Sequence, residues 1–157
     1  EGNFTSFPGL YGWFFRNCNT LPLSSNVGTM KKFLHAVKTL LARNEKILIY
    51  PEQGMWWNYR KPRPTEPGAY KIAAMNKVPI IPLFITMNDS ELIGGDGFPI
   101  QEYTIHILPA IYPKEEAGVK ENCEYLQKEN YRVCKEVYEK VYGIPLVYDG
   151  KNYTDIK

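Results

Sequence analysis

The chain has 157 residues, of which 44% are hydrophobic and 23% charged, and its 12 tyrosines and 3 tryptophans exclude an intrinsically disordered protein. This length favours a single domain with a sizeable core, which we expect to cover residues 1–157. The formal net charge of +2 is too small to indicate a nucleic-acid-binding protein, so we expect no nucleic acid as a partner.

The first predicted elements follow from the spacing of apolar residues. Helical spacing predicts an amphipathic helix over residues 29–43, with its basic residues mostly on the other face. A short run rich in branched side chains predicts a buried strand over residues 47–50. Residues 68–77 can form a short helix, and the sequence VPIIPLFI, residues 78–85, predicts a second buried strand. The order strand, helix, strand predicts a right-handed parallel crossover.

The second half of the chain is predicted to complete the same fold. Residues 87–101 are polar, contain GGDG and predict a loop, and the alternation over 103–108 predicts a third strand. Residues 119–142 predict a long helix, and residues 148–157 a polar tail. The helix presents to the core Cys123, Leu126, Cys134, Val137, Tyr138 and Val141. The predicted fold class is therefore α/β, a mostly parallel sheet with flanking helices.

The three cysteines indicate neither disulfides nor a metal site. Cys18, Cys123 and Cys134 are odd in number and form no C-x-x-C pair. Cys123 and Cys134 lie eleven residues apart in a helical pattern, too far along the axis to bridge, so we interpret them as small core residues. The longest apolar run, residues 78–87, is half the roughly twenty residues that a membrane span needs.

A candidate site follows the first predicted strand. The stretch ILIYPEQGMWW places Glu52 directly after that strand, and ligands of open parallel sheets bind at the carboxyl ends of strands. Gly54 permits close backbone approach, and the tryptophans that follow form an apolar wall. The guanidinium and ammonium groups of the RKPR run suit phosphate. The predicted substrate-binding residues are Pro51, Glu52, Gln53, Gly54, Trp56, Arg60, Lys61 and Arg63.

A structural interpretation of the same residues stays open. Glu52 can serve as a helix cap or as the acid of a surface turn, which is the common role of a glutamate in a loop. The RKPR run can be a solvated loop, and the tryptophans can fill the core.

The stretch YPEQGMWW, followed some two dozen residues later by VPIIPLFI, resembles two sequence blocks of the glycerolipid acyltransferases, the lysophosphatidic acid acyltransferase family. In that family a strand runs into F-P-E-G-T-R, a glycine leads a helix, and V-P-I-[IV]-P-V closes the unit. Pro51 and Glu52 match the first block, Gly68 and Ala69 the glycine segment, and residues 78–82 the last block. The resemblance covers about residues 10–85, over half of the chain.

The chain departs from the family pattern at positions that bind phosphate or catalyse. Gln53 stands where the family has glycine, and apolar residues near Trp56 replace the family's arginine, so we expect Arg60, Lys61 or Arg63 to supply that charge. Leu21 to Leu23 fall on the apolar-proline-apolar run of another block, with Ser24 and Ser25 where acid and arginine are expected, and Arg16 as a weak substitute.

The family's catalytic block, H-x-x-x-x-D, has no counterpart here. Its histidine is the general base for the acceptor hydroxyl, and its aspartate orients the imidazole. His35 is followed five residues on by Leu40, and His106 by Ile111. We therefore expect a C-terminal fragment, truncated at its N-terminus, with the catalytic block preceding Glu1, and no catalytic residue in this chain.

The resemblance implies a phospholipid-biosynthesis acyltransferase with a glycerol-3-phosphate acyltransferase-like fold. It implies a lysophospholipid acceptor such as 1-acylglycerol-3-phosphate, acyl-CoA or acyl-carrier protein as co-substrate, and no cofactor or metal. It also implies that the full-length protein is cytoplasmic and peripheral to the cytoplasmic membrane face. Two alternatives remain: a non-catalytic binding module for a phosphorylated lipid or other anionic ligand, and, less favoured by the net charge, a single-strand nucleic-acid binder.

Overall fold

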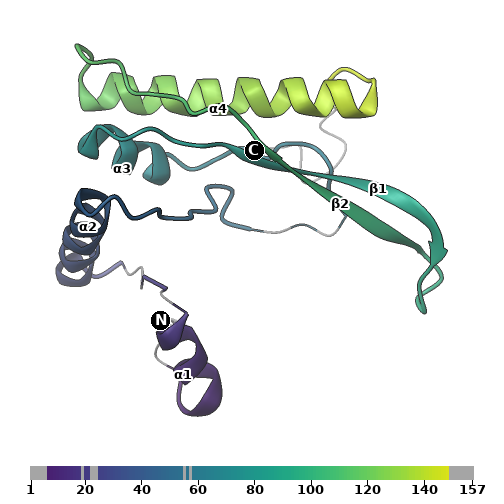
Figure 1. Cartoon of the computed structure of the whole chain (residues 1–157), viewed down its shortest axis with the longest axis horizontal. Coiled ribbons are helices and arrows are strands. Elements are labelled where there is room, and N and C mark those ends of the chain that lie inside the picture. The colour runs from purple at the N-terminus through teal and green to yellow at the C-terminus, as the bar shows by residue number, and fades with distance from the viewer. Residues whose placement is uncertain (1–6, 19, 22–24, 55, 57, 149–157) are drawn as a thin grey trace. The chain divides into compact units, whose positions relative to one another are not determined.

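The computed structural model describes residues 7–18, 20–21, 25–54, 56 and 58–148. These residues form four helices and two strands, drawn in Figure 1. The chain divides into two compact units, Glu1–Leu48 and Ile49–Lys157. The elements in chain order are α1 (Gly9–Asn17), α2 (Val27–Ala42), α3 (Gly68–Asn76), β1 (Leu83–Ile93), β2 (Pro99–Ile107) and α4 (Val119–Tyr142).

In the second unit, α3 packs against the N-terminal half of α4. Tyr70, Ala73 and Ala74 of α3 form a buried cluster with Cys123 and Leu126 of α4. The small side chains of Ala73 and Ala74 let the two helices approach closely. This cluster supports the residues that precede α3.

A second cluster joins the C-terminal half of α4 to the sheet. Phe84 of β1 packs with Cys134 and Tyr138 of α4 and with Leu146, which follows the helix. Gly143 ends α4 in the left-handed conformation, with φ of 66°, which glycine adopts without steric cost. The chain can therefore turn back and place Leu146 under the helix.

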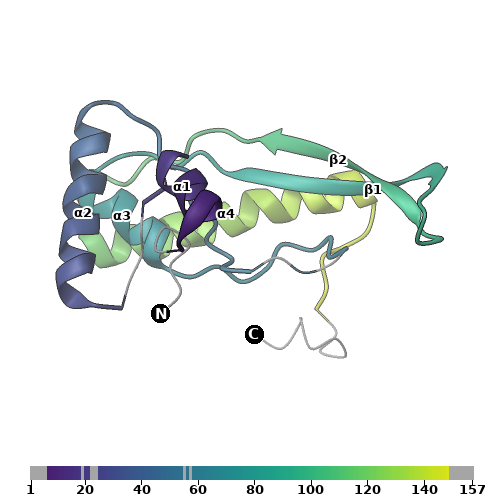
Figure 2. The same cartoon turned by 90° about the horizontal axis from the view of Figure 1, so that it is seen from below.

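The strands β1 and β2 form an antiparallel hairpin. The register runs from Leu83 opposite Ile107 to Asp89 opposite Gln101. Gly97, with φ of 82°, lies in the turn between the strands. The tip of the hairpin extends past the C-terminal end of α4 in both views (Figures 1 and 2).

The parallel arrangement predicted from the sequence is wrong for these strands, although helices and a sheet are both present. Residues 47–50 form no strand, and Leu48 and Tyr50 are 63% and 77% exposed. A buried strand requires a neighbouring strand for its backbone N–H and C=O groups, and no strand of the described residues pairs with this segment. The predicted loop over 87–101 instead belongs largely to the hairpin, with GGDG at its tip.

The three predicted helices are confirmed as α2, α3 and α4. In α4 the predicted inward residues Cys123, Leu126, Cys134 and Tyr138 are buried, whereas Val141 is 37% exposed because it lies at the last turn. The helix α1 was not anticipated. None of the helices formed by the described residues is long and apolar enough to span a bilayer. The predicted tail lies outside the described residues, except for Tyr148.

Candidate functional site

The segment between residues 50 and 67 forms a closed loop at the start of the second unit. Its base is held by a backbone hydrogen bond in which Glu66 N donates to Pro51 O at 2.8 Å. Just inside this bond, Arg63 N donates to the carboxylate oxygen Oε1 of Glu52 at 3.2 Å. Glu52 therefore holds the two ends of the loop together. We name the segment 51–66 the acidic loop after this residue.

The carboxylate of Glu52 is half-buried. Burial raises its pKa above the usual 4.5, while the hydrogen bond from Arg63 N and the charge of Arg63 act in the opposite direction. Burial raises the pKa of Tyr70 to about 12 and that of Cys134 to about 12, and the charge of Glu52 contributes to both shifts. The carboxylate of Glu52 is therefore partly withdrawn from bulk solvent.

Of the three predicted cations in the acidic loop, Arg63 makes its contacts within the loop itself. Its guanidinium carbon lies 3.3 Å from the centroid of the Trp56 ring, a cation–π contact. Nη1 of Arg63 donates a hydrogen bond to the carbonyl of Gly54. A Cβ at Gly54 would lie 3.0 Å from that same nitrogen, so a larger residue here would require the Arg63 side chain to shift slightly. The Nε atom of Arg63 is buried and has no hydrogen-bond partner among the described residues.

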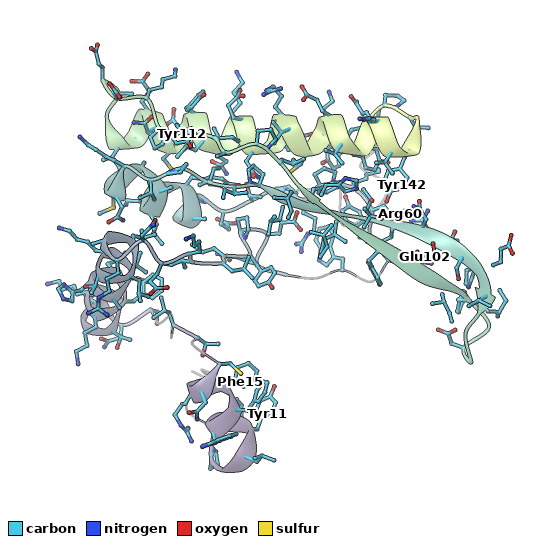
Figure 3. All side chains as sticks on the ribbon, in the orientation of Figure 1. Tyr11, Phe15, Arg60, Glu102, Tyr112 and Tyr142 are labelled. Carbon is cyan, nitrogen blue, oxygen red and sulfur yellow. The ribbon has the colours of Figure 1, made fainter. Side chains whose placement is uncertain are left out.

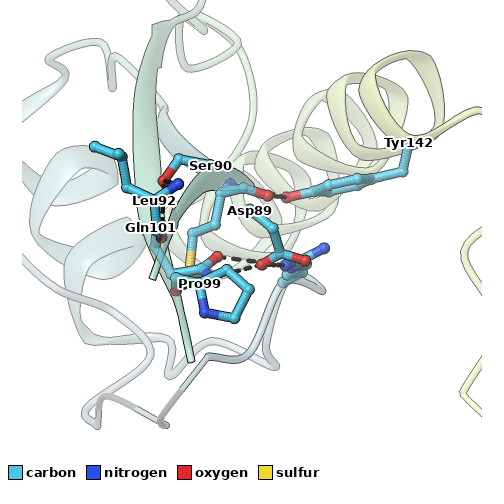
Figure 4. Close-up of polar contacts among 8 residues, drawn as sticks. Asp89, Ser90, Leu92, Pro99, Gln101 and Tyr142 are labelled. Carbon is cyan, nitrogen blue, oxygen red and sulfur yellow. Dashed lines mark hydrogen bonds and ion pairs between the residues drawn. The ribbon is translucent and has the colours of Figure 1, made fainter. Parts of the chain in front are cut away.

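The other predicted cations have different partners. Nη2 of Arg60 lies 2.7 Å from Oδ1 of Asp89 and 3.3 Å from Oε1 of Gln101, which joins the acidic loop to the hairpin. Figure 4 shows Asp89 and Gln101 in this cluster, and Figure 3 shows Arg60 near the strands. The Gln101 amide and the Arg60 charge hold the pKa of Asp89 below its usual value. Lys61 lies over the ring of Tyr148, with Nζ 5.5 Å from its centroid.

Gln53 has a backbone conformation that glycine adopts more readily than other residues. Its φ is 54°, in the left-handed region, and its N–H donates to the Tyr50 carbonyl at 3.3 Å. Glycine adopts this conformation without cost, and the resembling family has glycine at this position. The side chain of Gln53 is exposed. Met55 and Trp57 lie outside the described residues, so the apolar wall is represented by Trp56 alone.

Residues remote in sequence complete the base of the acidic loop. Nε2 of Gln127 donates to the Thr65 carbonyl at 2.6 Å. The Tyr70 hydroxyl donates to Oγ1 of Thr65 at 3.0 Å and accepts from Nδ2 of Asn130 at 2.9 Å. Gln127 and Asn130 lie on α4, some sixty residues after the loop, and no local pattern marks them as its partners.

A pocket of about 540 Å³ lies where the end of the acidic loop meets α4. None of the eight predicted site residues lines it. Its lining combines charged and aromatic side chains and consists of Pro64, Thr65, Glu124, Gln127, Lys128, Tyr131 and Tyr148. No group of three or more His, Cys, Asp or Glu among the described residues is arranged to hold a metal ion.

Neither histidine is part of this site. Nε2 of His106 lies 2.8 Å from Oγ1 of Thr86, a buried hydroxyl on the neighbouring strand. His35 is exposed on α2 in the first unit. His106 therefore has a structural partner rather than a carboxylate that would orient it as a base.

The structure thus brings together Glu52, Gly54, Trp56 and Arg63, and gives Arg60 and Lys61 other partners. A family model described as acyltransferase matches residues 3–86 of the chain. The match covers more than half of the sequence and includes the whole acidic loop. The comparisons with curated proteins and with solved structures returned no match.

Proposed function

Because the chain belongs to the acyltransferase family, we propose that it binds the acceptor of a reaction that transfers a fatty acyl group to a lysophospholipid such as 1-acylglycerol-3-phosphate. The donor would be the thioester of acyl-CoA or of an acyl-carrier protein. The proposal places the protein at the cytoplasmic face of the membrane, where such an acceptor resides. The observation that carries it is the contact of Arg63 with Glu52 and Trp56 inside the matched segment.

Arg63 is the residue we assign to the acceptor phosphate. Its guanidinium is held in place by the ring of Trp56 and the Gly54 carbonyl, so little conformational entropy is lost when an anion binds. Its donors present a planar fork that matches phosphate oxygens. Arg60 is a weaker candidate because Asp89 already compensates its charge.

Glu52 has a dual role in this proposal. Oε1 accepts the hydrogen bond from Arg63 N, which orients the carboxylate and keeps the loop closed. Oε2 makes no hydrogen bond with any described residue, so it can accept one from an acceptor hydroxyl. Such a bond orients the acceptor, and the same carboxylate fixes the backbone that carries Arg63.

The reaction itself requires a group that this chain does not supply. The acceptor hydroxyl attacks the thioester carbonyl carbon, the new ester bond forms as the carbon–sulfur bond breaks, and the thiol takes up a proton. A general base that removes the hydroxyl proton contributes typically 100-fold to 10,000-fold in rate. His106 is held by Thr86, and His35 has no aspartate at the required spacing. We therefore propose that the 157-residue chain alone does not turn over.

The binding test compares 1-oleoylglycerol-3-phosphate with 1-oleoylglycerol, which lacks the phosphate. We expect the chain to prefer the phosphorylated lipid, and Arg63→Gln to reduce its affinity about tenfold or more, the loss of one charged hydrogen-bonding partner. Lys120→Gln removes an equal charge from an exposed position on α4 and should leave affinity unchanged. Equal affinity for the two lipids, or an unaffected Arg63→Gln variant, contradicts the proposal.

The activity test separates the enzyme from the alternative, a non-catalytic module that binds a phosphorylated lipid. Acyl transfer from oleoyl-CoA to the same acceptor is measured for the chain alone and for the protein with any native sequence that precedes Glu1. We expect turnover only when a histidine–aspartate block is present. If the longer protein binds the acceptor but transfers no acyl group, the binding module is favoured. The observation that supports this alternative is that His106 is a partner of Thr86.

A further inference from the structure

The helix α1 exposes an apolar face. Leu10, Trp13 and Phe14 are 80%, 56% and 54% exposed. Their spacing of three and four residues places them side by side on one face of the helix. Soluble proteins seldom leave a contiguous group of large apolar side chains in water, and such a group marks an interaction site.

Ring contacts beside this face hold α1 together. The rings of Phe7, Tyr11 and Phe15 form an edge-to-face series, with centroids 5.9 Å and 4.9 Å apart. Figure 3 shows Tyr11 and Phe15 together on α1. Gly12 is buried, because the Phe7 carbonyl approaches so closely that a Cβ there would lie 1.7 Å from it. Phe14 adds an edge-to-face contact with Phe15, with centroids 5.7 Å apart, whereas Leu10 and Trp13 take part in none of these ring contacts.

The helix α2 adds a basic stripe that includes exposed apolar residues. Lys31 and Lys38 lie seven residues apart on one face, and Leu34 lies between them and is 36% exposed. Lys32 is also exposed, and none of these lysines has an ion pair with a described residue. The helix contains no Asp or Glu, so nothing on it compensates these charges.

Charge is distributed unevenly between the two units. Residues 1–48 contain six Lys and Arg and two Glu, a formal charge of +4. The total over all 157 residues is +2, so residues 49–157 carry −2. The unit with the exposed aromatic helix is therefore also the basic one, a combination typical of proteins that bind anionic bilayers.

From these observations we propose that α1 and α2 form a docking surface for an anionic lipid bilayer. Leu10, Trp13 and Phe14 enter the boundary between headgroups and acyl chains, where tryptophan is enriched. Lys31, Lys32 and Lys38 contact anionic headgroups. The nine residues 18–26 between the helices allow both to reach one surface, since an extended chain of that length spans roughly 30 Å. This inference rests on the proposed function, because a membrane-resident acceptor gives the docking its purpose.

Vesicle sedimentation tests the electrostatic part. The chain is mixed with vesicles of phosphatidylcholine alone or of phosphatidylcholine with phosphatidylglycerol, without lysophospholipid. We expect binding to the anionic vesicles, and a loss of roughly 100-fold in the partition coefficient for Lys31→Gln, Lys32→Gln and Lys38→Gln combined. The matched control, Lys71→Gln, Lys120→Gln and Lys128→Gln, removes equal charge from exposed positions of the second unit and should change binding less than about threefold.

Fluorescence quenching by brominated lipids tests the insertion of α1. When the wild-type protein is bound to anionic vesicles, the brominated lipids should quench the emission of Trp13. The Trp13→Phe variant lacks this tryptophan and should therefore show less quenching. Trp13→Ser with Phe14→Ser should reduce binding at least tenfold even when all lysines are present. Circular dichroism before vesicle addition verifies that each variant remains folded, and the lysine variants test the surface independently of α1.

Three results would overturn the docking surface. They are equal binding to neutral and anionic vesicles, equal losses for the two lysine triples, and quenching that is the same with and without Trp13. Salt-sensitive binding to single-stranded nucleic acid but not to vesicles would likewise refute it. Glu52→Gln serves to separate the proposals: it should weaken acceptor binding but leave vesicle binding intact. Failure of acceptor binding with normal docking refutes the proposed function alone.

Discussion

The carboxylate of Glu52 accepts a hydrogen bond from the backbone nitrogen of Arg63 across eleven residues of sequence, at 3.2 Å. The same arginine stacks on Trp56 and binds the carbonyl of Gly54. One acid thus orients the backbone of the residue whose side chain supplies the positive charge. This coupling links the acid to the cation, and its consequences can be measured.

Glu52→Ala should destabilise the protein. The substitution removes the acceptor for Arg63 N, and we expect a loss of about 1 kcal/mol in the free energy of unfolding, the usual net value of one hydrogen bond. Glu52→Gln keeps a carbonyl oxygen at that place and should lose less. Urea denaturation followed by circular dichroism measures both. Identical losses for the two variants would mean that the hydrogen bond contributes nothing.

The stability should depend on pH through Glu52. Burial raises the pKa of this carboxyl in the folded state above its usual 4.5, so the folded protein holds the proton more tightly than the unfolded chain does. The resulting stabilisation is fully present below pH 4.5 and is lost as the pH rises through the folded-state pKa. Relative to Glu52→Gln, the wild type should therefore become less stable as pH increases from 4.5. A difference that grows in favour of the wild type would contradict this sign.

Arg63→Lys should cost more than Arg60→Lys. Lysine retains the charge at position 63 but loses the planar contact with Trp56 and the hydrogen bond to the Gly54 carbonyl. We expect the free energy of unfolding to fall by about 1 kcal/mol. At position 60 a lysine can still reach Asp89, and this partly exposed ion pair contributes less than about 1 kcal/mol. Thermal unfolding of the two variants provides the comparison, and the reverse order would show that Arg63 is not anchored as described.

Gln53→Gly should stabilise the loop. Gln53 has φ of 54°, a left-handed conformation that costs a residue with a side chain roughly 1 kcal/mol relative to glycine. Asn58 has φ of 51° and provides the control, because asparagine tolerates this conformation and Asn58→Gly should gain less. Chemical denaturation measures both gains. A loss of stability in Gln53→Gly would show that its side chain makes a compensating contribution.

Tyr142→Phe should loosen the hairpin from α4. The Tyr142 hydroxyl accepts a hydrogen bond from Met87 N at 2.9 Å and donates one to Met87 O at 3.1 Å. Figure 4 shows the Tyr142 side chain reaching from α4 to the strand. Removing it leaves two backbone groups without this partner and should cost about 1 to 2 kcal/mol. Amide hydrogen exchange should accelerate at Met87. Tyr131→Phe, at an exposed position on the same helix, should have no such effect.

The helices were predictable because helical periodicity is a local property. The ends predicted for α4 coincide with those observed, and four of its six predicted inward residues are buried. The partners of the strands were not predictable in this way. The apolar run 78–85 has the composition of a buried strand in any sheet, yet Leu83 and Ile85 are 48% and 46% exposed in the hairpin. Strand direction depends on the neighbouring strand, which no local window contains.

The sequence by itself placed an acid, a glycine and a tryptophan on one loop ahead of three cations, because those residues all lie within the stretch 52–63 and their chemistry follows from their identities. Only the tertiary structure decided which cation stays with the acid: Arg63 contacts Glu52 and Trp56, whereas Arg60 joins Asp89 and Lys61 lies over Tyr148. The physical reason is that a long cationic side chain reaches several partners, and the choice depends on the hairpin and on α4, which bring distant residues to the loop.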